Sequence, residues 1–117
     1  DELLAFWKAA NDYMKLSDPS KRIAEARRIY ELFVKDGAEQ QINIPQASQV
    51  ARTIGKQIDE GERGEVELAP KIFVRAQTEV FKMMQSDPFK RFRADKTALS
   101  ELIDTFFTDA DTRGVGR

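Results

Sequence analysis

The chain opens with DELLAFWKAANDY, residues 1–13, which places its only tryptophan directly after a phenylalanine. Apolar residues recur through this stretch at the three- and four-residue spacing of an amphipathic helix. So short a helix cannot shield both Phe6 and Trp7 from water by itself. We therefore expect this first helix to pack against segments further along the chain.

Length and composition favour one modest binding domain. The 117 residues are 41% hydrophobic and 33% charged, which is ordinary for a soluble globular protein. A net charge of −1 gives no support to non-specific nucleic-acid binding. Without cysteine or histidine the chain lacks disulfides, the usual zinc ligands and the commonest general base. We expect no cofactor, and, because the sequence begins at Asp1, a fragment of a longer protein.

A second helix is predicted after the polar stretch at residues 17–20. Asp18 is suited to the N-cap position and Pro19 to the first helical position that follows it. Gly37 lies where the C′ residue of this helix belongs. The hydrophobic face in between continues the helical period without a break.

Two further helices are predicted to open at prolines. Pro45 can start a third helix, which should fail by Gly61. The charged segment 59–65, with two glycines and no apolar residue, is typical of an exposed loop. Pro70 can open a fourth helix, which Asp87-Pro88 interrupts because a residue before proline is disfavoured in the α region.

A short fifth helix and a last one over residues 99–107 complete the prediction, and residues 109–117 are expected to fray. No stretch alternates as a strand would. The fold class is therefore predicted to be all-α, an antiparallel helical bundle of about six helices over residues 1–108.

Four segments, in this order, resemble the regulator of G-protein signalling (RGS) domain. They are Glu2–Trp7 with the acidic-aromatic pair at 12–13, Ala26–Val34, Gln41–Ile44, and Phe73–Met84 running on into Asp87–Phe92. RGS domains carry further short helices before the Phe-Trp helix, so we expect those helices to lie outside this chain. The asparagine that often follows the family's first acidic residue is Leu3 here.

The resemblance implies a GTPase-activating protein for the GTP-bound α subunits of heterotrimeric G proteins, which terminates signalling and has no catalytic group of its own. It also implies a monomeric, cytoplasmic domain, with recruitment to the inner face of the plasma membrane as a further expectation. An RGS-like scaffold that binds a partner without activating it is the alternative, favoured by Leu3 and by the missing front helices.

The resemblance assigns three polar residues of the later motifs to the Gα switch surface, namely Asn43, Asp87 and Arg91. Asn43 is implied to reach the catalytic glutamine and switches of the GTPase, although an asparagine chosen for turn geometry is the alternative. Asp87 and Arg91, one turn apart, are implied to accept switch amides and to support that contact. A capping aspartate and a solvated arginine remain the alternative for this pair.

Glu2 and Met83 complete the implied Gα-binding set. Glu2 resembles the acidic contact to the first switch, and its alternative is a favourable charge at a helix N-terminus. Met83 occupies the position of an apolar contact, and a core methionine is an equal alternative. The aromatic residues assigned to the core are Phe6, Trp7, Tyr30, Phe33, Phe73, Phe81 and Phe92.

Lys21, Arg22, Arg27 and Arg28 form a basic group on the second predicted helix. Such a group can bind acidic lipid headgroups. A solvated helix face is the more usual explanation for such a run, and we prefer it.

Overall fold

The computed structural model describes residues 1–86, and those residues are all-α, as predicted. The elements are α1 (Glu2–Met14), α2 (Pro19–Ile29), the π-helix η1 (Tyr30–Val34), α3 (Ala47–Glu62) and α4 (Val74–Gln85). Residues 1–83 form one compact unit. The predicted fifth and sixth helices, together with Asp87, Arg91 and Phe92, lie outside the described residues.

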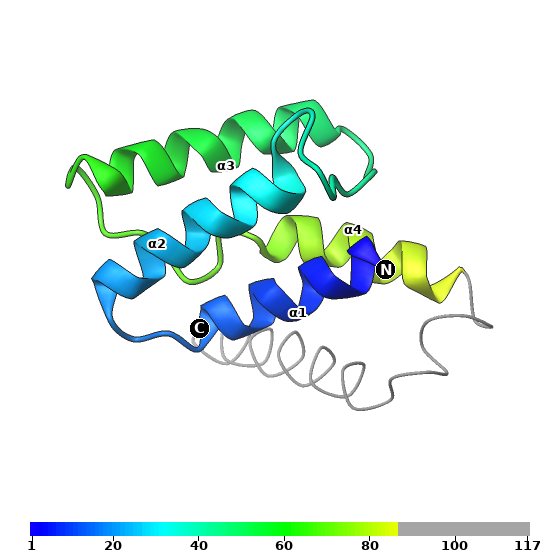
Figure 1. The fold of residues 1–117 in the computed structure, drawn as a ribbon, viewed down its shortest axis with the longest axis horizontal. Coiled ribbons are helices and arrows are strands. Elements are labelled where there is room, and N and C mark those ends of the chain that lie inside the picture. Colours follow the sequence, from blue (N-terminus) through cyan, green and yellow to red (C-terminus); the bar gives the residue numbers. More distant parts are fainter. Residues whose placement is uncertain (87–117) are drawn as a thin grey trace, which may run out of the picture. The chain divides into compact units, whose positions relative to one another are not determined.

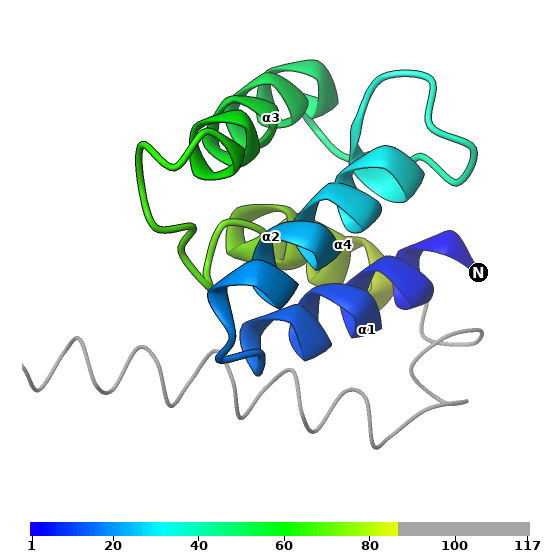
Figure 2. The same ribbon diagram turned by 60° about the vertical axis from the view of Figure 1, so that its left-hand side comes forward.

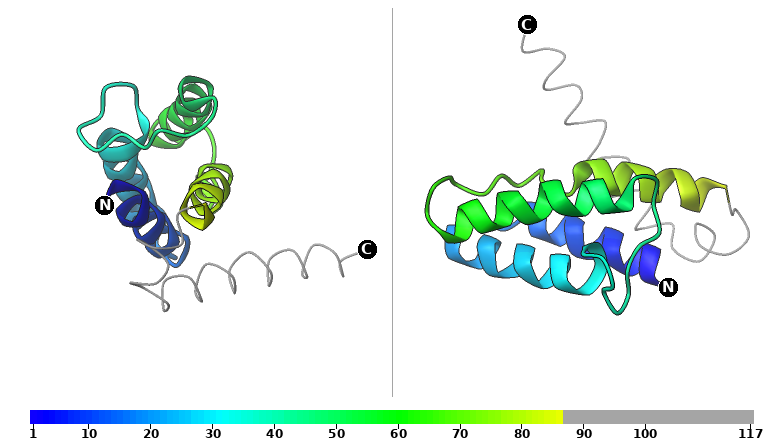
Figure 3. Two further views of the ribbon diagram at one scale, coloured as in Figure 1. Left: turned by 90° about the vertical axis from the view of Figure 1, so that its right-hand side faces the viewer. Right: turned by 90° about the horizontal axis from the view of Figure 1, so that it is seen from above.

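Successive helices run in opposite directions, as expected of helices joined by short connections (Figure 1). The central element is α2 with its continuation η1, which packs against α1 on one side and α3 on the other. The two panels of Figure 3 show that the start of α1, the loop 35–46 and the start of α3 lie at the same end of this unit.

Local capping chemistry sets the first two helix starts. The Asp1 carboxylate accepts a hydrogen bond from the Leu3 N–H at 2.8 Å, which satisfies one unpaired amide of α1. Asp18 does the same for α2, accepting from the Ser20 N–H at 2.9 Å. Pro19 occupies the first turn that follows, so the predicted Asp18-Pro19 start is confirmed.

The second predicted helix continues as a π-helix, which its apolar period did not indicate. The Lys35 N–H bonds the Tyr30 carbonyl, five residues back, at 2.9 Å. Lys35 then adopts an extended conformation and ends the helix. Gly37 has a left-handed φ of 81°, but it lies one position beyond the C′ residue, which is Asp36 and not Gly37 as predicted.

The predicted starts at two prolines were wrong by a few residues. Gln46 has a φ of 58°, in the left-handed region, so α3 begins only at Ala47 and not at Pro45. The chain after Pro70 forms a turn in which the Val74 N–H bonds the Lys71 carbonyl at 3.1 Å, so α4 begins at Val74.

The predicted loop 59–65 was also wrong in its first half, because α3 continues through Glu62. Arg27 on α2 holds this last turn in place. Its guanidinium donates to both carboxylate oxygens of Glu62, at 2.9 and 2.7 Å, and to Asp59 at 2.7 Å. Gly61 is buried in the same turn, with the Leu68 side chain against it.

Edge-to-face aromatic contacts form the centre of the core. Phe73 contacts Phe6 with ring centroids 6.1 Å apart and Tyr13 with centroids 5.2 Å apart. Phe6 also contacts Phe33 at 5.8 Å. The predicted burial is confirmed for Phe6, Trp7, Phe33 and Phe73.

Two predicted core aromatics are only half-buried, Tyr30 and Phe81. The Tyr30 ring lies against Gly55 of α3, and the Arg27 guanidinium lies over it, 5.5 Å from the ring centroid. The ring therefore makes a cation–π contact at the edge of the core.

Replacing Phe73 by leucine tests the aromatic cluster. The loss of two edge-to-face contacts should lower the free energy of unfolding by about 1–3 kcal/mol. Urea titration followed by tryptophan fluorescence measures this. V66A is the control, because Val66 is 47% exposed and its truncation should leave the unfolding midpoint nearly unchanged. Equal midpoints for F73L and the parent chain would contradict the central role of the cluster.

Replacing Arg27 by alanine tests the α2–α3 ion pairs. The Arg27 hydrogen bond lowers the pKa of Glu62, so the stabilisation should be complete above the pKa of Glu in the unfolded chain and be lost as pH falls through the folded-state value. R27A should therefore lose about 1 kcal/mol of stability near pH 7 and much less below about pH 4. Urea titrations across this pH range measure the difference.

R63A is the matched control for this pH series, because Arg63 pairs with Glu65, two residues away, in the exposed turn after α3. Its unfolding midpoint should stay close to that of the parent chain at each pH. A loss in R27A of equal size at about pH 3 would assign the effect to packing over Tyr30 and not to the carboxylates.

Candidate functional site

Asn43 lies in the loop 35–46 between two isoleucines that anchor it. Ile42 and Ile44 are 2% and 5% exposed, whereas Asn43 between them is exposed. The Ile42 N–H also bonds the Phe33 carbonyl at 2.9 Å, and the Gln40 N–H bonds the Leu32 carbonyl at 3.0 Å. The core therefore fixes the backbone on both sides of Asn43 and leaves its amide facing outwards.

Polar contacts fasten both ends of this loop. Near its start the Ser48 hydroxyl donates to the Asp36 carboxylate at 3.1 Å, so the loop is tied to the first turn of α3. At its end the Arg75 guanidinium donates to the Gln46 side-chain oxygen at 2.8 Å, so the loop is also tied to α4. Sequence reasoning missed both residues. Gln46 lies outside the motifs that carry the resemblance, and no local pattern pairs Arg75, which lies inside the Phe73–Met84 motif, with a residue 29 positions earlier.

Glu2 is exposed in the first turn of α1. A carboxylate there interacts favourably with the helix dipole, so this alternative to a partner contact fits the geometry equally well. The neighbouring Leu3 is only 7% exposed. Its side chain thus belongs to the core.

Met83 is half-buried on α4. Within the unit 1–83, α4 runs towards the end that also holds the start of α1 and the loop 35–46, as Figures 1 and 2 both show. The segments that carry Glu2, Asn43 and Met83 thus share one end of the unit. The other two predicted site residues, Asp87 and Arg91, lie outside the described residues.

The predicted basic group does not form a freely solvated face. Arg22 donates to the carbonyls of Leu16 at 2.8 Å and Leu68 at 3.1 Å, and its side chain is only 12% exposed. Arg28 donates to Glu25 at 3.0 Å, and Arg27 is held by the carboxylates of α3. Lys21 is exposed. Three of the four cations therefore have partners within the chain, which weakens the case for lipid binding.

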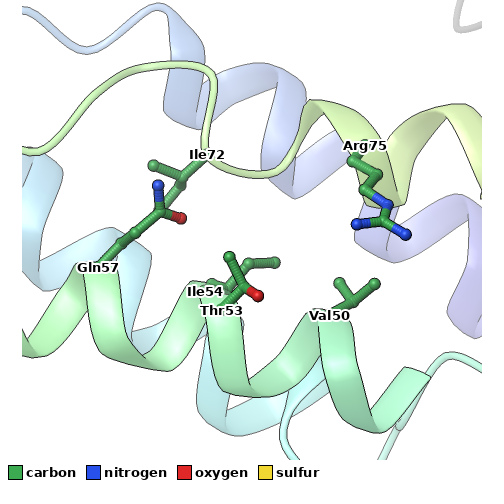
Figure 4. A pocket seen from close by; sticks show the side chains of 6 residues that line it. All are labelled: Val50, Thr53, Ile54, Gln57, Ile72 and Arg75. Atoms are coloured by element: carbon green, nitrogen blue, oxygen red, sulfur yellow. The ribbon is translucent and has the colours of Figure 1, made fainter. Parts of the chain in front are cut away.

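A small hollow separates α3 from the start of α4 (Figure 4). Its volume is about 50 Å³, and it is lined by Val50, Thr53, Ile54, Gln57, Ile72 and Arg75. A hollow of this size has room for one or two water molecules but not for a cofactor. Within residues 1–86 we also find no cluster of three acidic side chains arranged to bind a metal ion.

Two buried polar side chains bond one segment of the core to another. Burial raises the pKa of Tyr13, whose hydroxyl donates to the Ala69 carbonyl at 2.7 Å. Gln77 is fully buried and donates to the Trp7 carbonyl at 3.2 Å, so α4 is bonded to α1.

No helix among the described residues is both long and apolar enough to cross a lipid bilayer. The feature of the described residues that is best placed to meet a partner is thus the exposed Asn43 amide on its anchored loop.

Comparison with known proteins identifies the family of the chain. Residues 1–99 match the family model of the regulator of G protein signaling domain. The chain is 33% identical over 92 residues to regulator of G-protein signaling 5 from Sus scrofa, covering 79% of this chain and 46% of that protein. It is 31% identical over 101 residues to regulator of G-protein signaling 18 from Mus musculus, covering 85% and 38%. The chain thus spans less than half the length of these two relatives, and it belongs to the RGS domain family.

Proposed function

We propose that this domain accelerates GTP hydrolysis by the α subunit of a heterotrimeric G protein, and so shortens its signal. Membership of the RGS family supports this, together with the exposed Asn43 on its anchored loop. The proposed partner is the GTP-bound α subunit, and the proposed state of the domain is a cytoplasmic monomer. The single observation that carries the proposal is the family match over residues 1–99.

The mechanism needs no catalytic group from this chain. A Gα subunit already holds an arginine and a water-orienting glutamine, and its switch segments must be ordered around them. A partner that binds the switches best in their transition-state arrangement lowers the barrier by differential binding. Each tenfold gain in rate requires only about 1.4 kcal/mol of such preference.

Asn43 is proposed to supply part of this preference, because an amide can donate to one switch group and accept from another at once. Its anchored backbone keeps the loss of conformational freedom on binding small. Glu2, Met83, Asp87 and Arg91 are proposed to complete the switch-binding edge. Glu2 and Asp87 would accept switch amides, Met83 would add apolar contact, and Arg91 would support Asp87.

A scaffold without GTPase-activating capacity is the second candidate. The specific observation in its favour is Leu3, which is buried where many family members offer a polar side chain to the partner. One lost hydrogen bond would weaken the switch contact by about 1 kcal/mol, which lowers activity without abolishing it. We therefore keep activation as the leading proposal.

Single-turnover GTP hydrolysis by a panel of Gα subunits, with and without the domain, tests activation directly. N43A should reduce the stimulated rate roughly tenfold, the equivalent of about 1.4 kcal/mol, while the unfolding midpoint stays the same. Q40A is the matched control, since Gln40 is exposed in the same loop. If no Gα subunit responds to the domain, activation is wrong; if N43A matches the parent chain, Asn43 has no part in it.

Nucleotide dependence separates the activator from the scaffold. An activator should bind Gα carrying GDP and aluminium fluoride, which mimics the transition state, far more tightly than Gα carrying GDP alone. A scaffold should bind both states with similar affinity. Calorimetric titration of each state measures the two dissociation constants, and a ratio near one would favour the scaffold.

A further inference from the structure

Gln46 has an unusual backbone conformation at the end of the Asn43 loop. It is the only non-glycine residue with a positive φ, 58°, within the described part of the chain. It also precedes α3 at the N-cap position without making a side-chain cap. Left-handed backbone is disfavoured for a residue with a side chain, so the surrounding contacts must hold it.

The contact that engages the Gln46 side chain comes from α4. Its amide oxygen accepts a hydrogen bond from the Arg75 guanidinium at 2.8 Å. Arg75 lies in the first turn of α4, 29 residues further along the chain. The bond therefore joins the end of the Asn43 loop to a different helix.

Apolar packing between α3 and α4 is incomplete beside this bond. α3 packs mainly on α2 and η1, and the hollow lined by Val50, Ile54 and Ile72 lies between α3 and the start of α4. Figure 4 shows Arg75 on α4 at the same end of this hollow as Val50 on α3. Packing alone thus leaves the spacing of the two helices weakly determined there, and the polar link across the gap limits it.

We propose that the Gln46–Arg75 hydrogen bond is a clamp that fixes the Asn43 loop relative to α4. Gln46 and Arg75 are then positioning residues for the switch-binding edge, since Asn43 lies three residues before the clamp and Met83 lies on the clamped helix. This inference rests on the proposed GTPase-activating function. The Asp36–Ser48 contact holds the other end of the loop, so polar bonds hold the loop at both ends.

Three substitutions separate the clamp from simple stability. Q46G removes the side chain while permitting the positive φ, so it should fold as well as the parent chain. R75A removes the donor. Q46E keeps an acceptor of the same length and gives it a charge that Arg75 can pair with, so it should retain the clamp. R52A is the matched control, because Arg52 is an exposed arginine on α3.

The readout is the preference for Gα with GDP and aluminium fluoride over Gα with GDP alone, measured beside the single-turnover rate. Q46G and R75A should each lower this preference roughly fivefold, and the double variant should lose no more than either one, because both remove the same contact. Q46E and R52A should match the parent chain. Hydrogen exchange at the loop amides of Gln41 and Ile42 should be faster in Q46G and in R75A than in the parent chain. In Q46E and R52A the exchange rates should be unchanged.

The outcomes are distinguishable. Losses that multiply in the double variant would show that the two residues act separately and would overturn the clamp. Parent-like preference in both single variants would overturn it while leaving the activating function intact. A parent chain that stimulates no Gα subunit would instead overturn the proposed function, and the role of the clamp with it.

Discussion

The edge-to-face packing of Phe73 against Phe6 and Tyr13 is the contact on which the rest of the unit depends. Phe73 directly precedes α4, while Phe6 and Tyr13 lie nearly two turns apart on α1, so the contact fixes the position of α4 along α1. The buried Gln77, one turn further on, bonds the Trp7 carbonyl in the same register. Because interiors are close-packed, a shift of either helix would disturb all of these contacts together.

The same core determines how Asn43 is displayed. Phe33 packs on Phe6 with its ring and accepts the Ile42 N–H with its carbonyl. A single hydrogen bond, from Ile42 to Phe33, thus joins the exposed loop to the aromatic cluster. Rigid elements place functional groups more accurately than free loops do, and Asn43 gains that accuracy while remaining in water. The position of Asn43 at the surface therefore depends on the packing of Phe33 in the core.

Sequence reasoning found what local chemistry determines and missed what distant contacts determine. The helical period at Phe6-Trp7 and the Asp18-Pro19 start depend on neighbouring residues, and both were predicted correctly. The last turn of α3 depends on Arg27, 32 and 35 residues away from the two carboxylates it binds, and no local pattern reveals this. Neither the composition nor the spacing of apolar residues predicted that Asn43 is exposed. Only the resemblance to a known family singled out this residue.

Gln46 shows why the edge of a site is harder to predict than its centre. Glycine and asparagine are common in left-handed backbone conformations, whereas glutamine is not. The sequence therefore did not indicate the positive φ of Gln46 or the late start of α3. The Gln46 side chain bonds Arg75 of α4 and makes no cap on its own helix. A local preference is thus sacrificed for a contact between two elements. If the domain acts as proposed, by binding another protein's switches, the rigidity of its own loop is the property that such a contact serves.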